Sequence, residues 1–192
     1  MWFKTVLIGF AFLSLNAFCD VPKLLIMVSG QDVNKKVAEK LKPIGEKFGA
    51  TTTLVELEKL KLPLYTPGLE NNLGHFDKKR VKKFQKLVSE ASGFIICAPE
   101  YNGGIPPVTL NALTWASKIK PGVWNYALSG KGVLICSKSR GKGERILKVM
   151  RAQFKFAGMK VSTKDLVPDR WGSIDKAELH QAMNRLVKRI VK

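Results

Sequence analysis

The sequence predicts an α/β fold, in which a parallel β-sheet carries α-helices on both of its faces. Two observations predict it. Short apolar runs alternate along the chain with longer segments that have apolar residues at helical spacing, and this alternation is typical of strands joined by crossover helices. The runs Lys23–Val28 and Gly93–Ala98 are almost continuously apolar, as expected for strands that are buried on both faces.

Five strands are expected from the apolar and β-branched runs. In chain order they are Lys23–Val28, Thr51–Leu57, Gly93–Ala98, Gly132–Ser137 and a fifth that opens with Gly158–Val161. Hydrophobic residues make up 45% of the 192 residues, so the chain is expected to fold around a core of its own.

Five helices are expected between and after these strands. They span Val33–Phe48, Phe76–Ala91, Pro107–Lys118, Gly143–Ala157 and Ile174–Val191. Gly49 is a suitable end for the first helix, and Pro43 is a candidate kink inside it. Five alternating strands and helices favour a flavodoxin-like, doubly wound, five-stranded parallel sheet of order 2-1-3-4-5. In that order the loops after strands one, three and four converge on one crevice.

The first 19 residues are expected to be a secretory signal peptide. Lys4 is followed by the uncharged apolar segment Val6–Leu15, which is too short to span a bilayer. Ala17-Phe18-Cys19 offers a cleavage site, so the domain proper is expected to span residues 20–192. Leu15-Asn16-Ala17 is an alternative cleavage site. An uncleaved anchor and a hydrophobic first strand are the alternatives to a signal peptide. The protein is expected to be periplasmic or secreted, with a lipid anchor at Cys19 as the alternative.

The formal charge is +18, and much of it lies in His75–Lys86 and Lys138–Lys164. One interpretation is a lysine-rich solvated surface, and another is attraction to phosphates, anionic lipid or nucleic acid. The expected signal peptide argues against nucleic acid as a partner. We also expect no stable membrane insertion of the mature chain.

Several classes of enzyme lack their sequence signatures here. The chain contains no G-x-S-x-G, H-E-x-x-H or Walker motif, so the sequence does not support a hydrolase, a zinc protease or a P-loop protein. Cys97 and Cys136 have no partner at C-x-x-C spacing, which removes the usual metal and thioredoxin interpretations. These two cysteines are expected to be buried thiols, or a disulfide if their strands are neighbours.

The most informative segment is Pro99-Glu100-Tyr101-Asn102-Gly103-Gly104-Ile105-Pro106, between the third strand and the third helix. Prolines fix φ at the ends of this loop, and its glycines allow a ligand to approach the backbone closely. In an open α/β sheet, ligands bind beyond the carboxyl ends of the strands. This loop is therefore the first candidate for a binding site.

The same segment resembles the signature of NADPH-dependent FMN reductases. The resemblance rests on Pro99-Glu100-Tyr101-Asn102, then Ile105-Pro106, then Val108, Asn111, Ala112 and Trp115. Leu62–Tyr65 is similar to the family's loop after strand two, and Gly132–Gly143 is similar to its fourth strand and following loop. The family includes quinone, chromate and azo-dye reductases.

The resemblance implies non-covalent FMN, with NADPH or NADH as electron donor and a small molecule as electron acceptor. It implies that Ser29–Asn34 holds the phosphate, that Pro99–Asn102 lines the isoalloxazine ring and that Ser137–Gly143 closes the other side. The implied cofactor-binding residues are Ser29, Gln31, Asn34, Pro99, Glu100, Tyr101, Asn102, Gly103, Ser137 and Gly141. It implies no catalytic side chain and no metal. It also implies a homodimer or homotetramer, with Glu100 as a candidate inter-subunit contact.

Some positions depart from the family pattern, and some have simpler interpretations. Asp32 stands where a hydroxyl is usual, although an aspartate there can cap the next helix. Pro107, Leu110 and Thr114 replace the family's usual glycine, lysine and aspartate. These departures favour an alternative: an exported flavodoxin-like binding protein with weakened or lost flavin binding.

Four further side chains have more than one interpretation. Tyr101 could stack on a flavin or cover a sheet edge. Asn102 could make only an Asx turn. Asn34 could be a helix cap rather than a phosphate ligand. Trp115 is expected in the core or in an interface.

Overall fold

The computed structural model of the protein describes residues 21–30, 33–138 and 143–191. The predicted signal peptide lies outside the described residues, so its cleavage stays a prediction. The strands are β1 (Lys23–Val28), β2 (Thr51–Glu56), β3 (Gly93–Cys97), β4 (Gly132–Cys136) and β5 (Lys160–Val161). The α-helices are α1 (Val33–Lys47), α2 (His75–Glu90), α3 (Pro107–Ser117), α4 (Glu144–Phe156) and α5 (Lys176–Ile190), and two short 3₁₀ helices, η1 (Leu57–Leu60) and η2 (Leu69–Asn71), follow β2.

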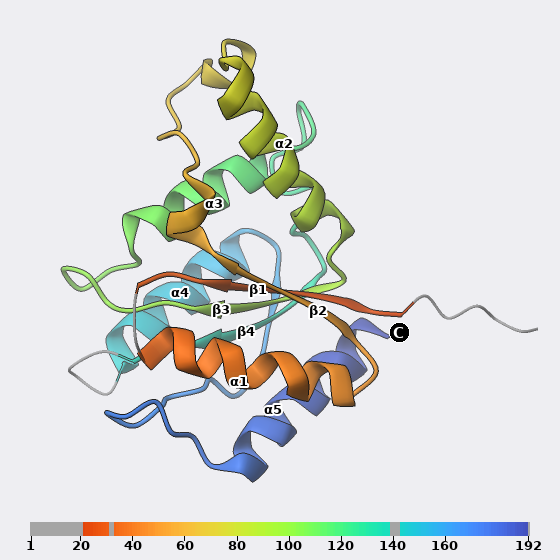
Figure 1. The fold of residues 1–192 in the computed structure, drawn as a ribbon, viewed down its shortest axis with the longest axis vertical. Coiled ribbons are helices and arrows are strands. Elements are labelled where there is room, and N and C mark those ends of the chain that lie inside the picture. Colours follow the sequence, from red (N-terminus) through yellow and green to blue (C-terminus); the bar gives the residue numbers. More distant parts are fainter. Residues whose placement is uncertain (1–20, 31–32, 139–142, 192) are drawn as a thin grey trace, which may run out of the picture.

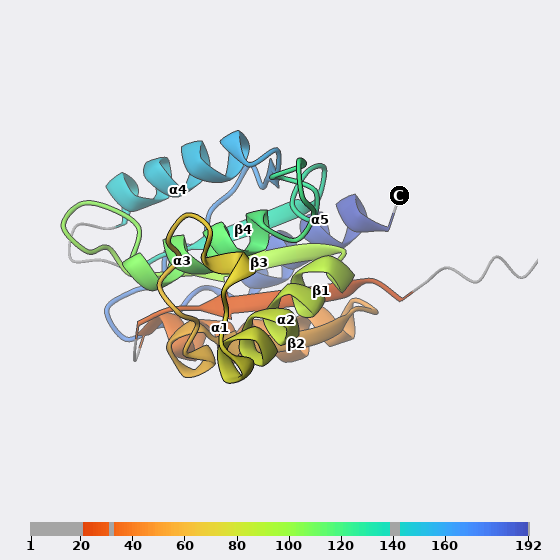
Figure 2. The ribbon, with the colours of Figure 1, turned by 90° about the horizontal axis from the view of Figure 1, so that it is seen from above.

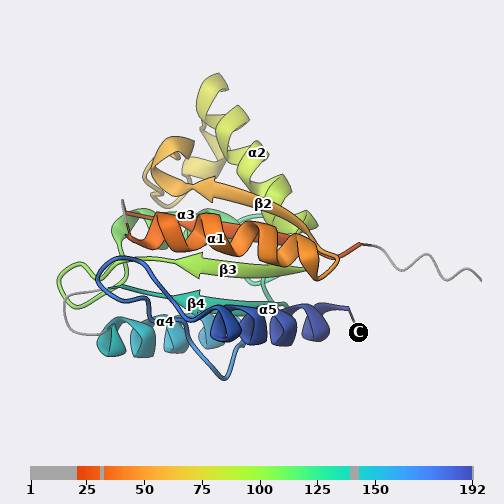
Figure 3. The same cartoon turned by 60° about the horizontal axis from the view of Figure 1, so that its bottom comes forward.

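The five strands form one parallel sheet of order β2-β1-β3-β4-β5. The predicted order is therefore confirmed, and so is the flavodoxin-like arrangement. Helices cover both faces, with α1 and α5 on one side and α2, α3 and α4 on the other (Figures 1 and 3). The strands all run in the same direction, so one edge of the sheet collects their carboxyl ends and the opposite edge collects their amino ends.

Burial explains why β1 has an uninterrupted apolar sequence. Leu24, Ile26 and Val28 belong to the core under α1 and α5, whereas Leu25 and Met27 belong to the core under α2, α3 and α4. Each side chain from Leu24 to Val28 therefore meets a helix layer, whichever face it points to.

Most predicted boundaries agree with the structure to within one residue. β5 begins at Lys160, two residues after the predicted Gly158. The start of α5 differs by as much, because the helix begins at Lys176 rather than at Ile174. The reason is a cap: the Asp175 side chain accepts a hydrogen bond of 3.0 Å from the backbone N–H of Glu178. Leu57, which was expected to end the second strand, instead begins η1.

The two cysteines lie opposite each other on neighbouring strands, because Cys97 of β3 is in register with Cys136 of β4. Both are fully buried, and both thiols are free. A hydrogen bond with Cys97, together with burial, raises the pKa of the Cys136 thiol well above its usual value. The pair is thus packed as two small apolar side chains at the carboxyl ends of two inner strands.

Candidate functional site

Three loops meet at the carboxyl edge of the sheet, after β1, β3 and β4 (Figure 3). The chain leaves β1 toward β2 on one side, while β3 and β4 lie on the other, so the loops diverge above β1 and β3. Such a switch point is where doubly wound sheets bind ligands. The structure therefore brings together the three segments that the sequence singled out.

The loop after β1 is tied to its neighbours by Ser29 and Gly30. Ser29 is buried, and its hydroxyl oxygen accepts a 2.8 Å hydrogen bond from the Thr109 hydroxyl of α3. Gly30 has φ of +72°, and a Cβ atom there would lie 2.7 Å from Cγ of Pro99. Only glycine allows this turn to pass so close to the loop after β3.

The loop after β3 is a tight hairpin. Tyr101 and Gly104 exchange two backbone hydrogen bonds of 3.1 and 2.9 Å, and between them Asn102 and Gly103 have φ of +50° and +78°. Two positive φ values in a two-residue turn are the geometry for which Asn-Gly is preferred. The hairpin holds the Tyr101 side chain half exposed at the rim, with 50% of its surface accessible.

The loop after β4 is fastened to both other loops. The Ser137 hydroxyl donates a 2.6 Å hydrogen bond to the carbonyl oxygen of Ala98, and the Lys138 N–H donates to Oδ1 of Asn34 at 3.0 Å. Asn34 is only 3% exposed. The Ser137 side chain therefore joins the loop after β4 to the end of β3, and the Asn34 side chain joins it to the start of α1.

These contacts show where the predicted cofactor-binding residues lie. Their binding to the cofactor stays a prediction. Ser29, Asn34 and Ser137 lie at the expected loops, but their hydrogen-bonding oxygens already have partners inside the protein. Pro99, Glu100, Tyr101, Asn102 and Gly103 lie together in and before the hairpin. Gln31 and Gly141, like Asp32, fall outside the described residues.

Three charged side chains, Glu58, Glu100 and Arg145, lie at the loops that form the crevice. The backbone N–H of Gly30 donates a 2.7 Å hydrogen bond to Oε1 of Glu58, which reaches over from η1. On the other side, Glu100 forms an ion pair with Arg145 at the start of α4, with 3.7 Å between Oε1 and Nη1. The N–H of Gly30, at the end of β1, therefore already donates to a carboxylate of the protein.

Two residues that follow the hairpin in the chain, Asn111 and Trp115, hold the loop after β2. Asn111 accepts from the Tyr65 N–H at 2.9 Å and donates to the Pro63 carbonyl at 3.0 Å. The indole N–H of Trp115 donates to the same carbonyl at 2.8 Å. Sequence reasoning placed Trp115 in the core or an interface, and its full burial confirms the core. It assigned no such role to Asn111, although the four-residue spacing puts both side chains on one helical face.

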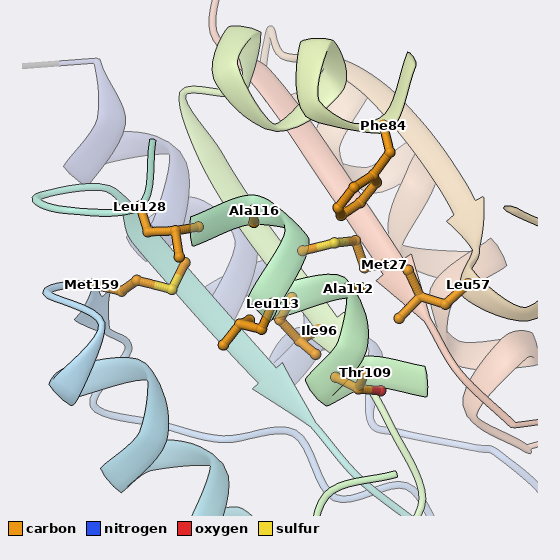
Figure 4. A pocket seen from close by; sticks show the side chains of 10 residues that line it. All are labelled: Met27, Leu57, Phe84, Ile96, Thr109, Ala112, Leu113, Ala116, Leu128 and Met159. Atoms are coloured by element: carbon orange, nitrogen blue, oxygen red, sulfur yellow. The ribbon is translucent and has the colours of Figure 1, made fainter. Parts of the chain in front are cut away.

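A small apolar cavity lies below the site, between α3 and the sheet (Figure 4). Its volume of about 10 Å³ is that of a single water at most, and its lining is almost wholly apolar, with Met27, Ile96 and Ala112 among the side chains. It is a packing gap and not a binding site for a cofactor.

The described part of the site fits an FMN. Gly30 brings the backbone after β1 against Pro99 of the loop after β3, α1 points its N-terminus toward the same edge, and the Tyr101 ring stands at the rim. A helix N-terminus favours a phosphate because of its free N–H groups and its dipole. Among the described residues, no group of three or more His, Cys, Asp or Glu side chains is placed to hold a metal ion.

A parallel sheet of this order with its loops gathered at the switch point defines a flavodoxin-like protein with a nucleotide-type site. The sequence narrows this class further, because residues 23–170 match the NADPH-dependent FMN reductase family. The chain belongs to that family. It is accordingly an NAD(P)H-dependent oxidoreductase with FMN as its cofactor.

Individual known proteins also have similar sequences. The chain is 26% identical over 147 residues to an uncharacterized protein of Mycoplasma pneumoniae, covering 75% of this chain and 84% of that protein. It is 31% identical over 80 residues to the quinone reductase of Escherichia coli, covering 42% of this chain and 39% of that enzyme. The match thus spans well under half of the quinone reductase.

The fold is shared with solved structures. The flavoenzyme NAD(P)H:acceptor oxidoreductase FerB from Paracoccus denitrificans superposes with a TM-score of 0.67 at 17% identity, covering 89% of this chain and 96% of that one. At this identity the likeness concerns the fold alone.

Proposed function

We propose that this protein reduces quinones or similar small acceptors with electrons from NADPH or NADH. The observation that carries the proposal is the Tyr101–Gly104 hairpin, which holds a half-exposed aromatic ring two residues after Pro99, the residue that packs against Gly30 of the loop after β1. An open rim with a flat apolar ring suits an acceptor that must stack on a flavin. The partial match to a quinone reductase supports the same class of acceptor.

When bound, FMN would supply the redox chemistry, which is hydride transfer from NAD(P)H followed by two-electron transfer to the acceptor. The chain's part is to bind and orient. Backbone groups of Gly30 and of Pro99–Asn102 would line the cofactor, while Ser29, Asn34 and Ser137 keep the loops in register. No side chain needs to move a proton for this role.

The test is a titration of the purified chain with FMN, followed by turnover. We expect quenching of FMN fluorescence, then oxidation of NADPH or NADH that depends on an added benzoquinone. FMN binding with NAD(P)H oxidation but no response to quinones would remove this acceptor class and leave the family assignment intact. A dye or a metal oxyanion in place of the quinone then identifies the acceptor.

A second candidate function is an exported flavodoxin-like binding protein whose flavin affinity is weakened. One observation favours it: the Glu58 carboxylate occupies the Gly30 amide at the phosphate end of the site. A fixed negative charge there opposes a phosphate dianion. Tight, stoichiometric FMN binding with turnover would rule this candidate out.

The export of the protein and its assembly are proposals as well. We propose a periplasmic or secreted location with cleavage after Cys19, or a lipid anchor at Cys19 as the alternative. We also propose a homodimer or homotetramer. Mass spectrometry of the mature N-terminus and light scattering of the purified protein test the two proposals separately. Among the described helices, none has both the length and the apolar character needed to cross a bilayer.

A further inference from the structure

The amino edge of the sheet, opposite the candidate site, carries a wide basic groove. Its volume is about 710 Å³, and it is lined where β3, β4 and β5 begin and where α5 ends. The five cationic residues in its lining are Lys131, Lys160, Arg185, Lys188 and Arg189. Among the described residues that line the groove, none is acidic. A concave surface of one charge sign concentrates counter-charges.

Two of these cations are held by the protein and three are not. Lys131 donates to the carbonyl oxygens of Val88 and Ser89 at 3.1 Å, and Arg189 donates to Lys160 and Val161 carbonyls. The side chains of Lys160, Arg185 and Lys188 are exposed and make no hydrogen bond or ion pair with the residues that the structure describes. Their charge is therefore free to act on a partner.

Exposed aromatic side chains stand at the same edge. The loop between α3 and β4 and the end of α4 present Trp124, Tyr126 and Phe156, which are 47%, 55% and 75% exposed. Trp124 and Phe156 stack with 5.3 Å between ring centroids, and Lys120 lies over the Tyr126 ring at 4.6 Å. We call these three residues the aromatic cluster. Tryptophan and tyrosine beside lysine are typical of surfaces that rest at the headgroup level of a membrane.

The apolar N-terminal segment also joins the domain at this edge. The backbone N–H of Lys23 donates to the hydroxyl of Ser92 at 3.1 Å, and Ser92 is itself part of the groove lining. Seven residues separate Lys23 from the apolar segment Val6–Leu15. The start of β1 and the end of α5 lie together at one end of the sheet, opposite the hairpin (Figures 2 and 3). The groove, the aromatic cluster and the chain entry therefore share one side of the molecule.

We propose that the amino edge docks on an anionic lipid surface. The free cations of the groove would meet lipid phosphates, and the aromatic cluster would enter the interface beside them. The candidate flavin site then faces away from the bilayer, open to water. The proposal concerns the edge opposite that site and does not depend on the proposed function.

The protein to test begins at Asp20, because every strand, helix and core residue described above lies within residues 21–191. Co-sedimentation compares vesicles of phosphatidylcholine alone with vesicles that also contain phosphatidylglycerol. We expect binding to the anionic vesicles only, with weakening as salt rises. Equal binding to both kinds of vesicle, or binding to neither, would overturn the proposal.

A matched pair of charge variants separates this edge from the general positive charge. The triple variant K160E/R185E/K188E should weaken binding about a hundredfold or more, since each basic residue near an anionic surface adds roughly a fivefold factor. The control K78E/K79E/K82E makes the same change of net charge on α2, where all three lysines are exposed. Equal losses in the two variants would show that only total charge matters. Thermal unfolding checks that both triple variants fold. If K160E/R185E/K188E does not fold, K160Q/R185Q/K188Q replaces it in the binding assay.

A charge-neutral pair tests the aromatic cluster. W124S/F156S should weaken binding to anionic vesicles several-fold, whereas W171S, which removes another exposed tryptophan far from the cluster, should not. Two further outcomes would assign the edge to another occupant. A dimer that W124S/F156S dissociates would assign it to a second copy of the chain. Displacement from vesicles by dilute inorganic pyrophosphate would assign the groove to a soluble anion.

Discussion

A Cβ atom on Gly30 would lie 2.7 Å from Cγ of Pro99, so the loops after β1 and β3 touch only because residue 30 is glycine. The contact joins the two segments that flank the switch point of the sheet. It also combines with a positive φ of 72°, which side chains other than glycine rarely adopt. The shape of the candidate site therefore depends on one absent methyl group.

We expect Gly30→Ala to lower the free energy of unfolding by about 2–3 kcal/mol, from backbone strain together with overlap. FMN affinity should fall with it. The matched control is Gly68→Ala, because Gly68 also has positive φ, of 84°, but nothing lies within 4 Å of its Cβ position. That control should cost about 1 kcal/mol. Chemical denaturation measures both, and equal costs would show that the Pro99 contact is unimportant.

Tyr101 should contribute to flavin binding and little to stability, because half of its surface is exposed and it lies beyond the core. We expect Tyr101→Ala to raise the dissociation constant for FMN about tenfold through loss of ring stacking. Tyr101→Phe keeps the ring and should leave the constant within about twofold. Fluorescence titration measures both. An unchanged affinity in the alanine variant would move the ring out of the binding site.

Glu58 should weaken FMN binding, because its carboxylate accepts a 2.7 Å hydrogen bond from the Gly30 N–H and so places a negative charge at that loop. Glu58→Gln keeps an oxygen acceptor and removes the charge, so the FMN dissociation constant should fall a few-fold at low salt. The gain should shrink as ionic strength rises. Glu90→Gln changes the net charge equally at the amino end of the sheet and should have no effect. A gain in both variants would point to total charge instead.

Asn111 and Trp115 should be coupled through the carbonyl oxygen of Pro63, which accepts from both side chains. Asn111→Ala should lower the free energy of unfolding by about 1–2 kcal/mol, since it leaves the Tyr65 N–H without its partner. The double variant N111A/W115F leaves the carbonyl without either donor. Its loss should therefore exceed the sum of the two single losses. Thr114→Ala, whose hydroxyl bonds only within its own helix, is the control, and additive losses would contradict the coupling.

The buried thiols should make stability depend on pH in the alkaline range. The pKa of Cys136 is raised in the folded protein by its hydrogen bond with Cys97 and by burial. Above the ordinary thiol pKa of 9.0, the unfolded chain releases this proton and the folded chain keeps it. The free energy of unfolding should therefore fall as pH rises beyond that value, by about 1.4 kcal/mol per pH unit for this group.

Denaturation at several alkaline pH values measures this slope, and Cys136→Ala should reduce it. An equal slope in that variant would assign the effect to lysines instead. A thiol reagent gives an independent check on the chain that begins at Asp20. It should react with neither cysteine until the protein unfolds, because both are fully buried.

The fold was predictable because a strand that is buried on both faces has an almost continuously apolar sequence. β1 has the predicted bounds, Lys23–Val28, since helices on both faces require an apolar side chain at nearly every position. The start of α5 was less predictable. Ile174 continues the apolar pattern, and only the capping geometry of Asp175 excludes it from the helix.

The candidate site was predictable as a set of loops and less so as a set of ligands. Ser29, Asn34 and Ser137 have the chemistry of phosphate ligands, and they lie where the sequence placed them. Their oxygens nevertheless serve partners distant in sequence, such as Lys138, which lies 104 residues after Asn34. No local pattern distinguishes a hydroxyl or amide that faces a ligand from one that joins two loops.

The sequence alone determined the class of fold, the strand order and the family. The reason is that apolar periodicity, apolar runs and a contiguous motif can each be identified from neighbouring residues. Tertiary structure alone decided that Ser29, Asn34 and Ser137 bond to partners inside the protein and that Glu58 reaches the amide of Gly30. It also decided that Lys160, Arg185 and Lys188 share one groove at the opposite edge. These relationships join residues far apart in the chain, and parallel strands bring such residues together only when the sheet is formed.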